Sequence, residues 1–254
     1  MNFLEIKAAF LKPRPFKTTA MLNVCLSGGI TRRWSLMGAW VLSLWTLGVH
    51  AADPNVVLDQ WFAAQTNLRS WSADFTQTRA LKALTQPLVT QGHLSFAMPK
   101  SFRWELGRPA KTIAMRHDDE MYVVYPLLKR AEHYPMGTNA PSEWRDMTSL
   151  LDAGFPKNRA AFAAAFRLVS SSETNGTWLL VLQPRSLFAQ KMLKELRVNL
   201  HTNDFSLRSH EMIFIDGSSM RNDFTNAVWN PSLEQSLFSW KPDPHFKVLE
   251  PLGK

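Results

Sequence analysis

Histidine, serine and acidic residues are the first candidates for chemistry in this sequence. A zinc site needs histidines spaced to share one metal ion, as in His-x-His or His-Glu-x-x-His. Neither pattern occurs among the histidines that follow residue 51, which are His93, His117, His133, His201, His210 and His245. The segment Gly217-Ser218-Ser219 lacks the Gly-x-Ser-x-Gly pattern of a hydrolase elbow and is typical of a hairpin turn.

The run His117-Asp118-Asp119-Glu120 places four possible metal ligands side by side. It lies between two apolar segments of alternating pattern, where a solvated turn is the expected structure. The sequence also has no glycine-rich phosphate loop. We therefore expect no catalytic residue, no metal site and no cofactor, and hence a protein that is not an enzyme.

An export signal precedes the folded part of the chain. Arg32 and Arg33 are followed by an apolar run over residues 34–48, and Val49-His50-Ala51 resembles a signal-peptidase site. The run is shorter than the about 20 residues of a membrane span, although an uncleaved anchor is an alternative. We expect residues 1–51 to be a leader and signal peptide cleaved near Ala51, with Met1, Met21 or Met37 as the start. Residues 52–254 then form one exported domain.

Charge and cysteine content exclude further classes of function. The formal net charge is +8, but the leader holds six of the basic residues and one acidic residue. The remaining domain is only mildly basic, which gives little support for nucleic-acid binding. The one cysteine, Cys25, also lies in the leader, so the domain has no disulfide and no thiolate ligand. Ala52 at the expected mature N-terminus excludes a lipidated cysteine there.

Most of the domain has the period-two pattern of β-strands, and Asp216-Gly217 is a strong hairpin signal. Turn residues separate the alternating segments at intervals of about ten residues, which favours an antiparallel sheet, sandwich or barrel. The expected strands cover residues 71–76, 93–96, 102–106, 113–115, 121–125, 129–133, 178–182, 196–200, 207–215 and 220–228.

Three segments have helical spacing instead. Residues 56–69 carry an apolar stripe, residues 142–151 follow Ser142 as a candidate N-cap, and residues 160–166 place two phenylalanines one turn apart. Gly154-Phe155-Pro156 separates the second segment from the third. The pattern therefore predicts a mainly β fold with helices (α+β) in a single domain.

Large apolar residues are abundant on the expected strands. They either fill the core of the sheet or line a ligand cavity, and spacing alone does not separate these two interpretations. Methionine is compatible with both, because its flexible side chain adapts to ligands of varied shape. The residues in question are Phe75, Phe96, Phe102, Trp104, Met115, Met121, Tyr122, Phe214 and Phe224.

Several motifs, in order, resemble the outer-membrane lipoprotein carrier protein (LolA) family. They cover most of residues 56–249. The segment Trp71-Ser-Ala-Asp-Phe-Thr-Gln-Thr-Arg79 resembles the opening strand of the family, and Gly92-His-Leu-Ser-Phe96 with Pro99-Lys-Ser-Phe-Arg-Trp104 resembles its first hairpin. Leu193-Lys-Glu-Leu-Arg-Val198 and Leu237-Phe-Ser-Trp-Lys-Pro242 resemble its later strands.

The resemblance implies an incomplete antiparallel β-barrel, covered by lid helices, that binds acyl chains in an apolar cavity. It implies a monomeric carrier that receives a lipoprotein or another lipid from an inner-membrane ABC exporter and delivers it to an outer-membrane acceptor lipoprotein. An envelope-stress regulator that binds a partner protein is the alternative. We expect the lid to include Met147, Leu150, Leu151 and Phe155, and the cavity to be lined by Phe75, Phe96, Phe102, Trp104, Met115, Tyr122, Phe214 and Phe224.

One position departs from the family pattern. The family commonly has an arginine directly before the proline of the first hairpin, where it holds the lid shut. This sequence has Met98 there. The resemblance therefore leaves open how the lid is held and whether the cargo is a lipoprotein or a different lipid.

Overall fold

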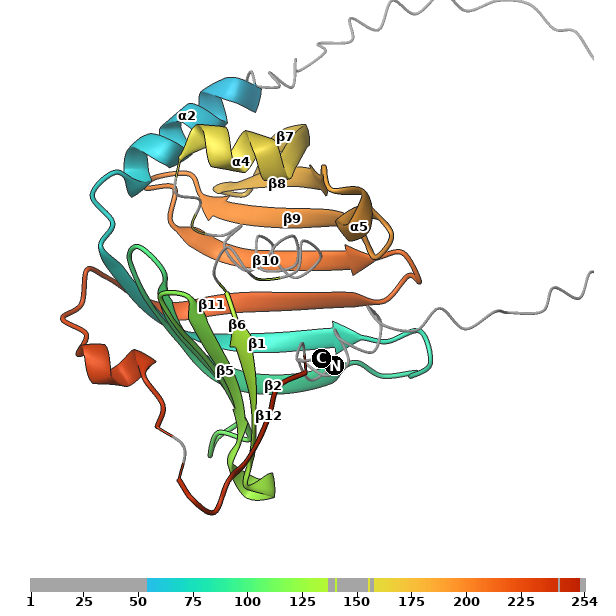
Figure 1. The fold of residues 1–254 in the computed structure, drawn as a ribbon. Coiled ribbons are helices and arrows are strands. Elements are labelled where there is room, and N and C mark those ends of the chain that lie inside the picture. The colour runs from blue at the N-terminus through green and yellow to red at the C-terminus, as the bar shows by residue number, and fades with distance from the viewer. Residues whose placement is uncertain (1–53, 137–139, 141–154, 156–157, 242, 252–254) are drawn as a thin grey trace, which may run out of the picture.

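The computed structural model describes residues 54–136, 140, 155, 158–241 and 243–251. Their strands form one open sheet of 12 strands, strongly curved, with two helices near one end (Figure 1). The predicted fold, an incomplete and mainly β barrel with helices, is confirmed. The signal peptide and the predicted helix at 142–151 lie outside the described residues.

The sheet has the strand order β12-β6-β5-β4-β3-β2-β1-β11-β10-β9-β8-β7. The first strand therefore lies between two antiparallel meanders, one formed by β2 to β6 and the other by β7 to β11. All pairs are antiparallel except β12, which lies parallel to β6. The strands are β1 (Ser70–Ala80), β2 (Leu88–Ala97), β3 (Ser101–Leu106), β4 (Thr112–His117), β5 (Glu120–Tyr125), β6 (Arg130–Pro135), β7 (Phe166–Thr174), β8 (Thr177–Pro184), β9 (Leu193–His201), β10 (Leu207–Phe214), β11 (Ser219–Trp229) and β12 (Lys247–Leu249).

Alternation along β1 explains why this strand is central. Trp71, Ala73, Phe75 and Gln77 are buried, while the residues between them are half-buried on the opposite face. Period-two burial is the pattern of a strand with one face toward a core. The predicted strand at 71–76 is confirmed, and it extends to Ala80.

Three α-helices are described: α2 (Pro54–Gln65), α4 (Arg159–Ala165) and the single turn α5 (Leu187–Gln190). Trp61 of α2 is fully buried and contacts the ring of Phe162 from α4 at a centroid distance of 5.8 Å. The side chain of Asn158 caps α4 by accepting a hydrogen bond from the backbone nitrogen of Ala161 at 2.8 Å. The predicted helix at 160–166 is confirmed, and the one predicted at 56–69 ends earlier, at Gln65.

The C-terminal segment packs on the outer face of the half of the sheet formed by β3 to β6. It contains the 3₁₀ turn η3 (Gln235–Phe238) and the short strand β12, and it supplies Trp240 and Phe246. These rings pack with Met115, Val124 and Ala131 in a small cluster separate from the main core. This half of the sheet therefore has an apolar cluster on each face.

Candidate functional site

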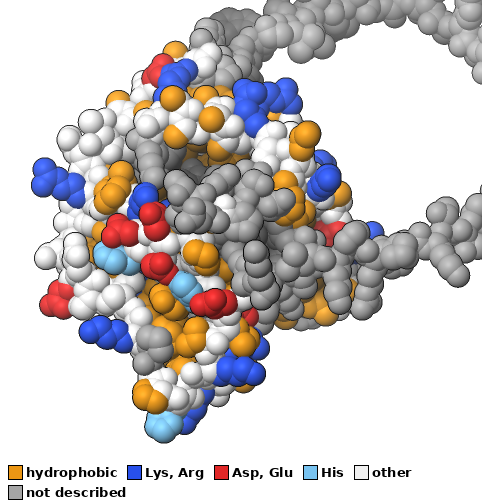
Figure 2. Space-filling view, in the orientation of Figure 1, with side chains coloured by type: hydrophobic (Ala, Val, Ile, Leu, Met, Phe, Trp, Pro, Cys, Tyr) orange, Lys and Arg blue, Asp and Glu red, His pale blue; other side chains and the backbone are white. Residues whose placement is uncertain are grey.

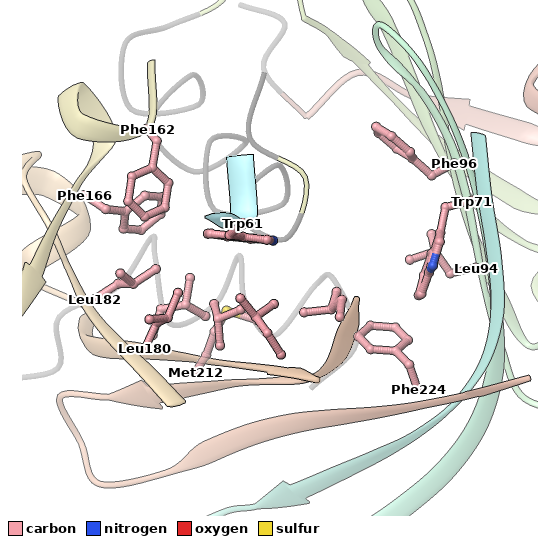
Figure 3. Close-up of a cluster of buried hydrophobic side chains, with 14 of the residues drawn as sticks. Trp61, Trp71, Leu94, Phe96, Phe162, Phe166, Leu180, Leu182, Met212 and Phe224 are labelled. Carbon is pink, nitrogen blue, oxygen red and sulfur yellow. The ribbon is translucent and has the colours of Figure 1, made fainter. Parts of the chain in front are cut away.

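The inner face of the curved sheet is largely apolar. It joins buried residues of β1, β2 and β7 to β11 with others from α2 and α4 in one cluster. Figure 3 shows Leu180, Leu182 and Met212 on one wall and Trp71, Leu94 and Phe96 on the opposite wall, all pointing into the interior. The curvature of the sheet thus brings apolar side chains from distant strands around one space.

A pocket of about 360 Å³ opens at the helix end of this interior. Its volume lies within the range of small-molecule pockets, about 300–1,000 Å³. Its lining includes both apolar and polar side chains, and in the space-filling view this end of the molecule displays hydrophobic side chains among lysine and arginine side chains (Figure 2). The pocket is lined by Phe62, Gln65, Thr66, Leu68, Met98, Phe155, Asn158 and Arg159.

A polar clasp joins α4 to α2 beside this pocket. Arg159, the first residue of α4, forms an ion pair with Asp59 of α2. It also donates a hydrogen bond from Nη2 to Asn55 Oδ1 at 3.1 Å. Because both carboxylate and guanidinium are largely exposed, the clasp contributes little to global stability, but it connects two helices that are far apart in the sequence.

Phe155 connects the segment before α4 to the wall of the half-barrel. Its ring stacks on Phe96 at a centroid distance of 4.6 Å and lies 5.0 Å from Trp71. Phe155 was expected to belong to a lid, and the structure places it against the wall and in the lining of the pocket. The other expected lid residues, Met147, Leu150 and Leu151, lie outside the described residues.

Six of the eight residues expected to line a cavity lie on the inner face. Three are buried in the main cluster and three pack against it while remaining partly exposed. Phe75 contacts Trp104 at 4.3 Å between ring centroids and Phe224 at 6.1 Å. The six residues that the structure brings together are Phe75, Phe96, Phe102, Trp104, Phe214 and Phe224.

Met115 and Tyr122, which were expected in the same cavity, lie on the outer face. In the sheet, Met115 pairs with Arg103 rather than with Trp104, and Tyr122 pairs with Met115. Residues paired across neighbouring strands share a face, so both point away from the inner surface. There Tyr122 packs against Trp240 at 5.5 Å.

Other inner-face residues were not among the expected cavity residues. Trp61, Trp71, Phe162 and Phe166 all belong to the main cluster. The alternation of Trp71 with Phe75 on one strand and the four-residue spacing of the two phenylalanines were signals in the sequence that place them on shared faces. Neither of these two signals predicts that Trp61, which lies on α2, packs against the strands.

Met98 occupies the mouth of the pocket. It is 40% exposed, it lines the pocket, and its backbone nitrogen donates to the carbonyl of Arg69 at 2.8 Å. The family arginine expected at this position would therefore lie at the pocket rim. In this chain a neutral side chain is present there, and Arg159 supplies a cation from the other side of the same pocket.

Polar side chains, among them Arg79 and Arg116, interrupt the inner face at several places. On β10 and β11, His210 contacts Asn222, and burial lowers the pKa of His210 to about 4, partly offset by the charge of Asp223. On β6, Tyr134 Oη donates to Glu132 Oε2 at 2.5 Å, and burial, followed by that hydrogen bond and the carboxylate charge, raises the pKa of Tyr134.

Among the described residues, no group of three or more His, Cys, Asp or Glu side chains is arranged to hold a metal ion. Within the same residues, no helix has the length and apolar character needed to cross a membrane.

An open curved sheet with an apolar inner face and helices over one end is the architecture of a binding or carrier protein. The chain belongs to the outer membrane lipoprotein carrier protein LolA family, whose model matches residues 66–241. Proteins of this family act in the bacterial envelope. The resemblance identified from the motifs is confirmed.

Solved structures with similar folds have low sequence identity to this chain. An uncharacterized conserved protein from Thermus thermophilus is 10% identical, with a TM-score of 0.46 over 77% of this chain and 98% of that one. A LolA superfamily protein from Nitrosomonas europaea is 8% identical, with a TM-score of 0.40 over 75% and 99%. A putative outer membrane lipoprotein-sorting protein domain from Vibrio parahaemolyticus is 12% identical, with a TM-score of 0.40 over 72% and 94%. A comparison with curated proteins found no match.

Proposed function

We propose that this protein carries acyl chains, from a lipoprotein or another lipid, in the apolar interior of the half-barrel. The observation that carries the proposal is the largely apolar inner face, which collects rings from both walls and opens at a pocket under α2 and α4. Burial of an acyl chain gains about 0.8 kcal/mol per CH₂ group, so an acyl chain cannot leave a membrane for water without such a surface.

The carrier would work in the periplasm as one domain over residues 52–254, exported by a signal peptide over residues 1–51. It would receive its cargo from an inner-membrane ABC exporter and deliver it to an outer-membrane acceptor lipoprotein. Non-directional contacts suit this task, because a carrier must release what it binds, and apolar walls hold a chain without fixing one headgroup.

Native mass spectrometry with lipid extraction, on protein purified from a bacterial periplasm, tests the proposal. We expect an acylated protein or lipid to co-purify, and its identity decides between lipoprotein and other cargo. A mass of the protein alone, together with no uptake of a fluorescent acyl probe, would overturn the carrier function and favour a regulator that binds a partner protein.

A matched pair of variants ties the result to the inner face. Phe155→Ala removes a ring between the pocket and the wall, so we expect weaker probe binding. Tyr122→Ala removes a ring of similar size on the outer face, so we expect unchanged probe binding at temperatures where the variant is folded. Equal loss of binding in both variants would contradict the assignment of the inner face.

A further inference from the structure

A row of polar side chains crosses the middle of the apolar inner face. Gln77 of β1 is opposite Asn222 of β11, which in turn is opposite His210 of β10. Gln77 Nε2 donates to Asn222 Oδ1 at 3.0 Å, and Asn222 Nδ2 lies 2.7 Å from His210 Nε2. Gln77 and Asn222 are 5% and 0% exposed.

Apolar residues flank the row on one side along the strands, and on the other side two methionines flank it on β11 and β10 while Arg79 flanks it on β1. Phe75 and Phe224 form the next inward-facing pair on one side. Met220 and Met212 form the next pair on the other side, between β11 and β10. Burial of polar groups costs free energy unless they are hydrogen-bonded, so a polar row at this place requires that its members satisfy each other or a ligand.

The hydrogen bonds determine which nitrogen of His210 carries the proton. Since the Asn222 oxygen accepts from Gln77, the Asn222 amide nitrogen is the group that donates to His210 Nε2. A neutral imidazole with an accepting Nε2 carries its hydrogen on Nδ1. Burial keeps the ring neutral by lowering its pKa to about 4.

The Nδ1–H group remains available to a ligand. The structure gives it no hydrogen-bond partner among the described residues, and the His210 side chain is only half-buried. Its ring lies 5.4 Å from Phe224 and 6.2 Å from Trp104 between centroids, so the donor sits among the aromatic rings of the inner face. A single neutral donor in apolar surroundings suits an uncharged acceptor.

We propose that His210, held in its Nδ1–H form by Asn222 and Gln77, donates a hydrogen bond to the carbonyl oxygen of an ester- or amide-linked acyl chain bound on the inner face. This inference rests on the proposed acyl-chain carriage and adds a chemical preference to it. The apolar walls would bind the hydrocarbon, and His210 would set the depth at which the chain's carbonyl end comes to rest.

Displacement of a neutral fluorescent dye by methyl decanoate and by tridecane, a hydrocarbon of similar length, tests the preference in the mature protein. One net hydrogen bond corresponds to about 0.5–1.5 kcal/mol, so we expect His210→Phe to weaken methyl decanoate binding about three- to tenfold and to leave tridecane binding unchanged. His245→Phe, in the exposed C-terminal segment, should bind both ligands as the wild type does.

The outcomes separate the two proposals. If His210→Phe changes the affinities for the two ligands by the same factor, the carbonyl site is wrong and acyl-chain carriage stands. If neither binds, acyl-chain carriage fails and the carbonyl site with it. Nitrogen-15 NMR of the imidazole gives an independent readout without ligand: we expect a protonated Nδ1 and an unprotonated Nε2, and the opposite tautomer would overturn the assignment.

Discussion

The ring of Phe75 lies directly over Gly92 of the neighbouring strand. A Cβ atom at Gly92 would stand 2.1 Å from Phe75 Cζ and 2.4 Å from the carbonyl oxygen of Glu105. The glycine thus lets an inner-face ring approach the backbone of β2, and Phe75 in turn reaches Trp104 on β3. This contact gives a physical reason for the glycine that begins the first hairpin motif.

Substitution Gly92→Ala should therefore lower the free energy of unfolding. The added methyl group meets backbone on one side, so the strand has to shift, and overpacking of this kind costs about 1–3 kcal/mol. Urea denaturation checks the value. Gln91→Ala, at the exposed neighbouring position, should change it by less than about 0.5 kcal/mol; equal effects of the two substitutions would refute the close approach.

Loss of the clasp between α2 and α4 should increase local opening of α4 more than it lowers the free energy of unfolding. Arg159→Ala removes the ion pair with Asp59 and the hydrogen bond to Asn55, with a cost below about 1 kcal/mol in unfolding free energy. We expect faster amide exchange in α4 and faster association of an acyl probe. Arg167→Ala, on the exposed side of β7, serves as the control. Unchanged amide exchange in α4 of the Arg159→Ala variant would show that the clasp does not restrain this helix.

An arginine at position 98 should weaken binding of a neutral acyl chain. Met98→Arg places a second cation at the rim of a pocket that already contains Arg159, and ligand entry would then desolvate two like charges. Met98→Leu preserves an apolar side chain of similar volume and should bind as the wild type does. Probe titrations at low and high salt measure both variants; tighter binding by the arginine variant would contradict this account.

Stability should fall on acidification because of His210. Its pKa is about 4 in the folded protein and about 6.5 in an unfolded chain, so the unfolded state takes up a proton first. The contribution is complete above pH 6.5 and is lost as the pH falls toward 4, at a total of up to about 3 kcal/mol. Asp223 opposes the shift through its charge.

Urea denaturation between pH 7 and pH 4.5 measures this loss. We expect His210→Phe to have a shallower decline in unfolding free energy over that range than the wild type, whatever its absolute stability. His245→Ala should follow the wild-type slope. Parallel curves for wild type and His210→Phe would show that another group controls the acid response.

Periodicity predicted most of the fold, because burial in a strand or helix follows the local sequence. The alternation around Trp71 and the helical spacing of Phe162 and Phe166 both correspond to elements of the structure. Strand register does not follow from periodicity in the same way. Whether Met115 faces Trp104 or Arg103 depends on a turn between β3 and β4, and a shift of one residue exchanges the two faces.

The polar row could not be predicted from the sequence, for a related reason. Gln77, His210 and Asn222 are separated by many residues in the chain and meet only through the pairing of β1 with β11 and of β11 with β10. In the sequence, His210 is one of several scattered histidines with no partner at a recognisable spacing. No local spacing identifies a site whose members come from three strands.

The sheet is open: β7 and β12 end it and do not pair with each other. A closed barrel fixes its radius through the number and stagger of its strands. Among the described strands, the two halves of the sheet are hydrogen-bonded to each other only through β1 and β11, so a change in the curvature of these two strands can widen or narrow the interior without breaking a ladder of hydrogen bonds. The size of the interior would then depend on what occupies it, and the proposed carrier would be able to accept acyl groups of different lengths and numbers.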